Sequence, residues 1–179
     1  DVENTKAVRV YENATDAEDS EGRPPHSIEV VVDGGNTDEI AKAILQKKSG
    51  GIYTFGEIRT SVLGKYGDTI SIGFNRPEKV YVWVKVEITQ GGVSVEAEYE
   101  EIIKSIILKT KELTIGDSFL SQSYIQPIYA ALPGIKFCDI KVATGTETQK
   151  TGTYTAGNID ISQRQVIDLS AARIEVSLK

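Results

Sequence analysis

The segment from Gly22 to Gly56, GRPPHSIEVVVDGGNTDEIAKAILQKKSGGIYTFG, predicts a strand followed by a helix. Its apolar run from Ile28 to Val32 favours a strand, because β-branched side chains pack well on a pleated surface. A helix is predicted from Asn36 to Ser49, since Asn36 and Glu39 have the spacing of a capping box, which supplies partners to the first N–H groups of a helix. The buried stripe of this helix would consist of Ile40, Ala41, Ile44 and Leu45.

Around this segment the chain predicts an α+β fold of two small consecutive domains, 1–78 and 79–179. Each would be a mainly antiparallel or mixed sheet packed with one or two helices. In the first domain, Ser49-Gly50-Gly51 predicts a left-handed end to the helix. Further strands are expected at Ala7 to Tyr11, Ile52 to Leu63 and Thr69 to Phe74, with a hairpin turn between the last two. The boundary is placed at Asn75 to Glu78, where Pro77 cannot donate to a sheet.

The second domain opens with a long strand, Val80 to Thr89, whose valines alternate with Tyr81 and Trp83 on the opposite face. A helix is expected from about Ser94 to Glu112. A second helix is expected from about Ser118 to Leu132; because it contains Pro127, it should kink or start late. The remaining predicted strands are Ile135 to Val142, Ile159 to Ile167 and Ala172 to Leu178. The polar segment Thr144 to Gly157 has no periodicity and predicts a mobile hairpin loop.

Composition restricts the classes of function. The chain has 179 residues, 40% hydrophobic, and a formal net charge of −6. An acidic chain argues against nonspecific binding to nucleic acid or to an anionic membrane, which requires clustered Lys and Arg. Apolar runs are too short to cross a bilayer and no signal peptide opens the chain, so we expect a soluble protein made in the cytosol. The absence of Met, with Asp1 first, suggests a piece of a longer chain.

Residues that could carry chemistry are few. His26 is the only histidine, so no histidine-based metal cluster is possible, and we expect it to pack or hydrogen-bond at the entry to its strand. Cys138 alternates with apolar neighbours and is expected to be a buried small hydrophobe. The acidic loop from Asp16 to Glu21 lacks the pattern of an EF-hand and is expected to be solvated. The turn Gly34-Gly35 is expected to be a turn and cap rather than an anion site, because acidic residues flank it. We therefore expect no catalytic residue, no cofactor and no metal.

Several segments of this sequence resemble the C-terminal half of the baseplate J-like family of contractile-tailed phages and phage-tail-like particles. They are PPHSIEVVV, the Gly34-Gly35 pair, IAKAI, GGIYTFG, ISIGFNRPEKVYVWVKVEIT and LTIGDSFLSQSYIQPIYAALPGIKFCDIKV. The resemblance runs from about Val8 to the end, with no distinctive residues from Glu147 to Gly157. It implies a structural subunit of the baseplate wedge, made in the bacterial cytoplasm and located in the particle. It also implies partners among the other wedge proteins and neighbouring copies of this chain, with no enzymatic activity, nucleic acid or membrane.

The predicted protein-contact surface combines the aromatic face of the long strand with the polar loop. Its candidate residues are Tyr81, Trp83, Thr144, Thr146, Thr148, Thr151 and Tyr154. Trp83 has three open interpretations: a platform for carbohydrate, a core residue under a helix, or a protein contact. The main alternative function is therefore a carbohydrate-binding or other recognition module that uses the strand aromatics. A hydrolase is a further alternative, although no spacing singles out a pair of carboxylates.

Overall fold

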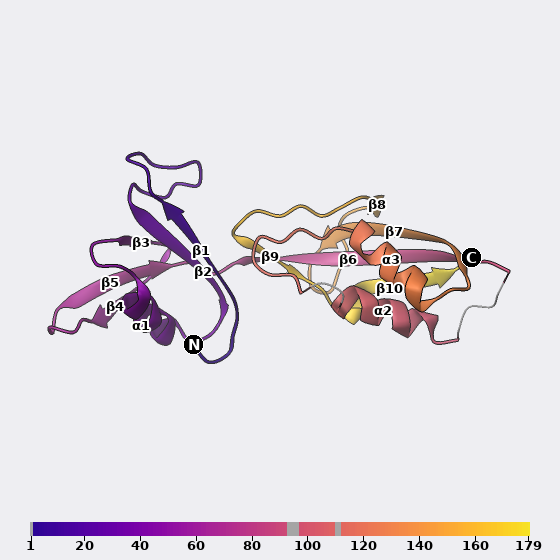
Figure 1. The fold of residues 1–179 in the computed structure, drawn as a ribbon, viewed down its shortest axis with the longest axis horizontal. Helices are drawn as coiled ribbons and strands as arrows, with labels where there is room; N and C mark the ends of the chain where they lie inside the picture. The colour runs from indigo at the N-terminus through magenta and orange to yellow at the C-terminus, as the bar shows by residue number, and fades with distance from the viewer. Residues whose placement is uncertain (1, 93–96, 110–111) are drawn as a thin grey trace. The chain divides into compact units, whose positions relative to one another are not determined.

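A computed structural model describes residues 2–92, 97–109 and 112–179 of the chain (Figure 1). The fold is α+β, as the sequence predicts. The chain divides into two compact units, Asp1–Glu78 and Lys79–Lys179. The domains expected from the sequence, 1–78 and 79–179, have the same bounds. Each unit has its own cluster of buried apolar side chains.

The first unit contains a three-stranded sheet in the order β1-β2-β3. Strand β1 (Thr5–Asn13) runs antiparallel to β2 (Ser27–Gly34), and the short β3 (Tyr53–Phe55) runs parallel to β2. Val8 lies opposite Val32 and Val10 opposite Val30, with a register shift between Thr5 and Ala7. Strand β1 is therefore an edge strand of this sheet.

Helix α1 (Thr37–Lys47) begins where the sequence predicts. Asn36 Oδ1 accepts hydrogen bonds from the backbone N–H groups of Asp38, at 2.9 Å, and Glu39, at 3.3 Å. Within the described residues the Glu39 side chain returns no bond to Asn36, so only half of the predicted capping box forms. The predicted stretch Ser49-Gly50-Gly51 does contain a left-handed residue, Gly51, with φ of 80°. This residue does not cap the helix, because the C-cap is Lys48 and its backbone is extended.

The predicted strand Ile52 to Leu63 is two strands, β3 and β4 (Ile58–Leu63). The two strands are separated at Gly56, which lies against the backbone of Phe74. A Cβ at this position would overlap the Phe74 backbone, a clash that only glycine avoids. Strand β4 pairs antiparallel with β5 (Thr69–Phe74) in the predicted hairpin. The core of this unit lies between α1 and the strands and consists of Val30, Val32, Ile40, Ala41, Ile44, Val62, Ile72 and Phe74.

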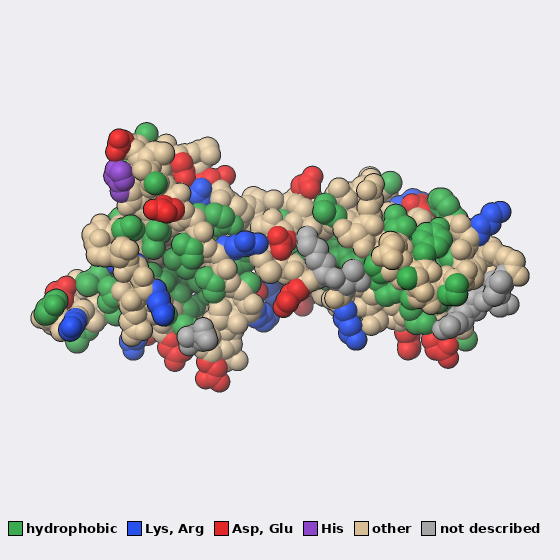
Figure 2. All heavy atoms as spheres, in the orientation of Figure 1, with side chains coloured by type: hydrophobic (Ala, Val, Ile, Leu, Met, Phe, Trp, Pro, Cys, Tyr) green, Lys and Arg blue, Asp and Glu red, His purple; other side chains and the backbone are tan. Residues whose placement is uncertain are grey.

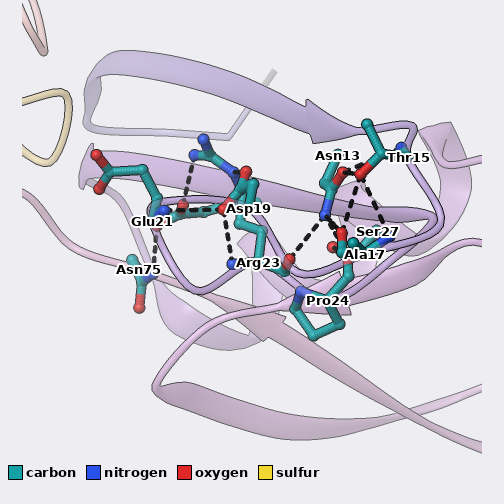
Figure 3. A network of polar contacts seen from close by, with 10 residues as sticks. Asn13, Thr15, Ala17, Asp19, Glu21, Arg23, Pro24, Ser27 and Asn75 are labelled. Carbon is teal, nitrogen blue, oxygen red and sulfur yellow. Dashed lines mark hydrogen bonds and ion pairs between the residues drawn. The ribbon is translucent and has the colours of Figure 1, made fainter.

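A polar network orders the loop between β1 and β2 (Figure 3). Asn13 is buried and its Nδ2 donates to the carbonyls of Ala17 and Arg23, both at 2.8 Å. Arg23 pairs with Asp19 (Nε–Oδ2, 2.7 Å) and with Glu29 on β2 (Nη1–Oε2, 3.1 Å). Glu29 is fully buried, and its Oε1 accepts from Asn75 Nδ2 at 2.6 Å. The network joins the loop, the central strand and the end of β5.

The sheet of the second unit is mixed, in the order β10-β6-β7-β8. Its long strand β6 (Glu78–Gln90) pairs antiparallel with β7 (Ile135–Gly145) and parallel with β10 (Ile174–Leu178). Strand β8 (Thr155–Ala156) extends the sheet from β7, and β9 (Gln165–Asp168) also pairs with β6. The predicted alternation is confirmed, because Val82, Val84, Val86 and Ile88 are fully buried.

Helices α2 (Tyr99–Lys109) and α3 (Gln122–Ala131) cover the valine face of this sheet (Figure 1). The predicted start of the first helix, 94–96, and residues 110–111 near its end lie outside the described residues. Helix α3 begins at Gln122, later than the predicted Ser118, but Pro127 lies inside it rather than at its start. Each helix contributes two fully buried side chains to the core. They are Ile103 and Ile107 of α2 and Tyr124 and Ile128 of α3.

Two predicted strands are shorter than expected. Of the predicted strand Ile159 to Ile167, only the last residues belong to a strand, β9. Ile159 instead forms an isolated bridge with Phe119, in which the two residues exchange backbone hydrogen bonds at 2.9 and 3.0 Å. The strand predicted from Ala172 begins at Ile174. Residues Ala171–Arg173 form a 3₁₀ turn in which Ser170 Oγ accepts from the N–H of Ala172.

Candidate functional site

The seven candidate contact residues lie at one end of the β6–β7 pair. Tyr81 is opposite Gly145 and Trp83 is opposite Ala143 in the antiparallel register. Thr144, the next-to-last residue of β7, lies opposite Val82, and the remaining candidates follow in the connection to β8. The structure therefore brings together the strand aromatics and the polar segment, which are about sixty residues apart in the sequence.

The polar segment forms a hairpin whose turn is held by its own hydrogen bonds. Thr146 N–H donates to Gln149 O at 2.8 Å, and Gln149 N–H donates to Thr146 Oγ1 at 3.0 Å. Thr144 O accepts from the N–H groups of Thr151 and Gly152. The threonines at 144, 146, 148 and 151 are exposed and Tyr154 is half-buried. The hairpin presents a row of hydroxyl and methyl groups on an ordered turn.

Trp83 connects the strand to this turn. Its indole Nε1 donates to Thr146 O at 3.2 Å, and the side chain is half-buried. Gly145 lets the turn approach closely, because a Cβ there would come within 2.8 Å of Lys150 Cα and 2.9 Å of the indole nitrogen. Of the three interpretations of Trp83 left open by the sequence, the structure tests only a core residue under a helix, and it contradicts that one. Trp83 packs in its own unit without lying under a helix.

Tyr81 is covered by Arg173, a residue that the sequence analysis missed. The Arg173 guanidinium lies over the Tyr81 ring, 5.2 Å from its centroid, and only 4% of Arg173 is exposed. Arg173 also donates to the carbonyls of Glu147 and Asp168 and pairs with the Asp168 carboxylate. A sugar platform requires an open ring face. The Arg173 guanidinium covers a face of the Tyr81 ring, which argues against the carbohydrate-binding alternative. Its hydrogen bond to the Glu147 carbonyl also holds the backbone of the hairpin.

Tyr154 anchors the return of the hairpin. Burial, assisted by the neighbouring Glu175 carboxylate, raises the pKa of its phenol above the ordinary value. The Lys150 ammonium lies 4.8 Å from the centre of its ring. Tyr154 therefore stays neutral at physiological pH and contributes its ring to packing.

Beyond the aromatics, the same face of β6 carries charges centred on Glu87. Its carboxylate contacts Lys179 Nζ at 2.8 Å and Lys141 Nζ at 2.9 Å, with Lys85 Nζ at 3.5 Å. Hydrogen bonds from Lys179 and then Lys141 lower the pKa of Glu87 from its ordinary 4.5 to about 2. The face is thus divided into an aromatic end and a charged middle.

We expect Glu87→Gln to flatten the acid limb of the stability profile. A carboxylate whose folded-state pKa is lowered binds fewer protons when folded than when unfolded, so its stabilisation is present above about pH 4.5 and is lost as the pH falls through about 2. Between these values the free energy of unfolding should rise less steeply with pH in Glu87→Gln than in wild type. Urea denaturation followed by fluorescence of Trp83, the only tryptophan, measures this difference. Parallel profiles would show that the lysine contacts do not persist in solution.

The other residues that could carry chemistry, His26 and Cys138, are not among the candidate contact residues. His26 is exposed and its Nε2 lies 2.8 Å from Asp16 Oδ1, which confirms a hydrogen bond at the strand entry. Cys138 is buried as predicted, and burial, with the charge of Asp139, raises the pKa of its thiol to about 11. Among the described residues, no group of three or more His, Cys, Asp or Glu is placed to hold a metal ion. No helix in the described ranges has the length and apolar character needed to cross a bilayer.

Neither the family models nor the curated protein sequences searched give a match to this chain.

Proposed function

We propose that this chain is a structural subunit of the baseplate wedge of a contractile phage tail or phage-tail-like particle and works through protein contacts rather than catalysis. The observation that carries the proposal is the ordered hairpin at the end of β6 and β7, which offers exposed threonines and little charge. No family model matches the chain, so the proposed relation to the baseplate J-like family rests on the order and spacing of the sequence segments from PPHSIEVVV onward.

The chemistry of the hairpin suits a protein partner. Threonine side chains combine a methyl group with a hydroxyl that donates and accepts, so they bury without an unpaired charge. The hydrogen bonds within the turn and the contacts of Trp83 and Arg173 hold the backbone before binding. A preorganised surface loses less conformational entropy on association than a disordered one. Each contact of a small unit is weak alone, and several contacts per copy in a ring add by avidity.

The proposed partners are the other wedge proteins and neighbouring copies of this chain, assembled in the bacterial cytoplasm into the baseplate. We expect capture of the neighbouring tail proteins, co-expressed from the adjacent genes, to fall at least about tenfold in Thr148→Lys/Thr151→Lys and in Trp83→Ala. The first variant places two cations on exposed positions, and the second removes the donor to Thr146 O. Affinity capture quantified by mass spectrometry gives the ratio.

Tyr66→Ala is the matched control, because Tyr66 is an aromatic residue 90% exposed at the β4–β5 turn of the other unit. It should capture partners as wild type does. Equal capture by all four proteins would remove the hairpin from the interface. Failure of wild type itself to capture any tail protein would reject the baseplate role.

A further inference from the structure

The first unit has an apolar groove that its own residues leave open. The groove, of about 620 Å³, lies beside α1 and is lined by residues of β1, β2 and the helix. Its β1 wall is Lys6, Val8 and Val10, and the two valines are 51% and 59% exposed. Figure 2 shows hydrophobic side chains gathered on this face between the β1–β2 hairpin and α1. Helix α1 covers the valines of β2 but not those of β1.

The groove coincides with an open sheet edge. In the described part of the chain β1 pairs with β2 alone, so alternate N–H and C=O groups along Ala7–Asn13 point away from β2. A register shift at Thr5/Ala7 ends the regular edge on one side. An edge strand with exposed apolar residues is a template for another strand, and charges on it decide which strand and register are accepted.

The charges along β1 are complementary to those of a second β1. If two copies pair antiparallel around a twofold axis at Arg9, then Val8 lies opposite Val10 of the other copy. Lys6, at the register shift where the regular edge ends, then lies beside Glu12 of the other copy. Lys6 and Glu12 are both exposed. Opposite charges and β-branched pairs directly across a ladder each contribute roughly 0.2 to 1 kcal/mol. Shifting this register by two residues puts Lys6 opposite Val10, or Glu12 opposite Val8. In this register Arg9 lies opposite Arg9 of the other copy, on the face of the sheet away from Val8 and Val10. This is the one pair of like charges.

We propose that two copies of this chain associate through β1, by antiparallel pairing centred on Arg9, which joins their sheets and covers Val8 and Val10. The axis is perpendicular to the sheet, so both α1 helices stay on the same face and the two grooves merge into one covered apolar strip. One strand pair buries less area than a standard stable interface, so the dimer of the isolated chain is weak, with a Kd of order 0.1 mM. The proposed function counts neighbouring copies of the chain among its partners, and this association names the surface for one such contact. It is measured on the isolated chain, so its failure is distinguishable from failure of the baseplate role.

Charge reversal along β1 tests the register. Lys6→Glu places two carboxylates opposite each other at both ends of the ladder, and Glu12→Lys places two ammonium groups there. Each single change should raise the dimer Kd at least about tenfold, and Lys6→Glu/Glu12→Lys should restore it to within about threefold of wild type. Sedimentation velocity from about 10 μM to 1 mM measures the Kd values. Thermal unfolding of each variant checks that the fold is kept.

Two features separate local pairing from general repulsion. Glu12→Lys lowers the net negative charge of an acidic chain, so general electrostatics predict tighter association whereas β1 pairing predicts weaker association. Lys42→Glu changes the net charge as Lys6→Glu does, at an exposed position of α1, and should leave the Kd unchanged. Hydrogen exchange should also show alternate β1 amides gaining protection as the concentration rises.

A wild-type chain that remains monomeric at 1 mM would overturn the proposal. Tighter association of Glu12→Lys, or a double variant as weak as the single ones, would also overturn it. Both of those results would place any self-association on another surface.

Discussion

Replacing Arg23 with alanine is expected to destabilise the first unit by about 3 to 5 kcal/mol. Arg23 pairs with Glu29, which is fully buried on the central strand of its sheet. Removing the guanidinium takes an opposite charge away from a buried carboxylate that also accepts a hydrogen bond from Asn75. The loss should appear as a lower denaturation midpoint in far-UV circular dichroism.

A neutral replacement of the pair separates the electrostatic loss from lost packing. Arg23→Met/Glu29→Gln keeps the approximate volume, and the new side-chain amide oxygen at position 29 can still accept from Asn75. The double variant should cost clearly less than Arg23→Met alone, because position 29 then carries no charge. Additive losses in this cycle, or a cost of Arg23→Ala below about 1 kcal/mol, would show that water or other groups already solvate Glu29.

Truncation of Ile107 to alanine should destabilise the second unit by about 2 to 5 kcal/mol. Its side chain is fully buried against the valine face of β6, so the change removes apolar contacts and leaves a cavity. Trp83 fluorescence reports this unit directly. The adjacent Leu108 is 39% exposed, and Leu108→Ala should cost within about 0.5 kcal/mol. In the first unit, Ile44→Ala should fall at the lower end of the range for Ile107→Ala, because Ile44 borders the open groove.

An unchanged midpoint for Ile107→Ala would place the buried stripe of α2 on another face. Equal losses for Ile107→Ala and Leu108→Ala would instead indicate that Leu108 is packed as tightly as Ile107, because alanine has the highest helix propensity and neither change can lose stability through propensity.

The elements that the sequence predicts well are those whose cause lies within a few residues. The cap at Asn36, the alternation of β6 and the turn between β4 and β5 all follow from local spacing. The break at Gly56 depends on the backbone of Phe74, and the bridge of Ile159 depends on Phe119. Such partners are invisible to a pattern read along the chain.

The candidate site shows the same division. Alternation on β6 identifies Tyr81 and Trp83, and low periodicity identifies the hairpin. Nothing local to Arg173 indicates that it is buried over Tyr81, since the two are joined only by the tertiary fold. The open edge of β1 is equally hidden, because the alternation of a strand does not tell an edge position from a central one. The contact of Glu29 depends on Asn75, 46 residues later in the chain.

The order of strands in the second unit has a consequence for synthesis on the ribosome. Strand β6 opens this unit, yet its partners on one side, β9 and β10, come from residues 165–168 and 174–178. The first unit pairs its strands within Asp1–Glu78 and can complete its core while the rest is still being translated. In the second unit, Val84 of the valine-rich β6 pairs with Ile174 of its parallel neighbour β10, so this pairing forms only after 90 further residues have been translated. Non-local pairing of this kind slows folding and prolongs exposure of an aggregation-prone strand. The nascent second unit is therefore the part of this chain with the greatest need for chaperone protection.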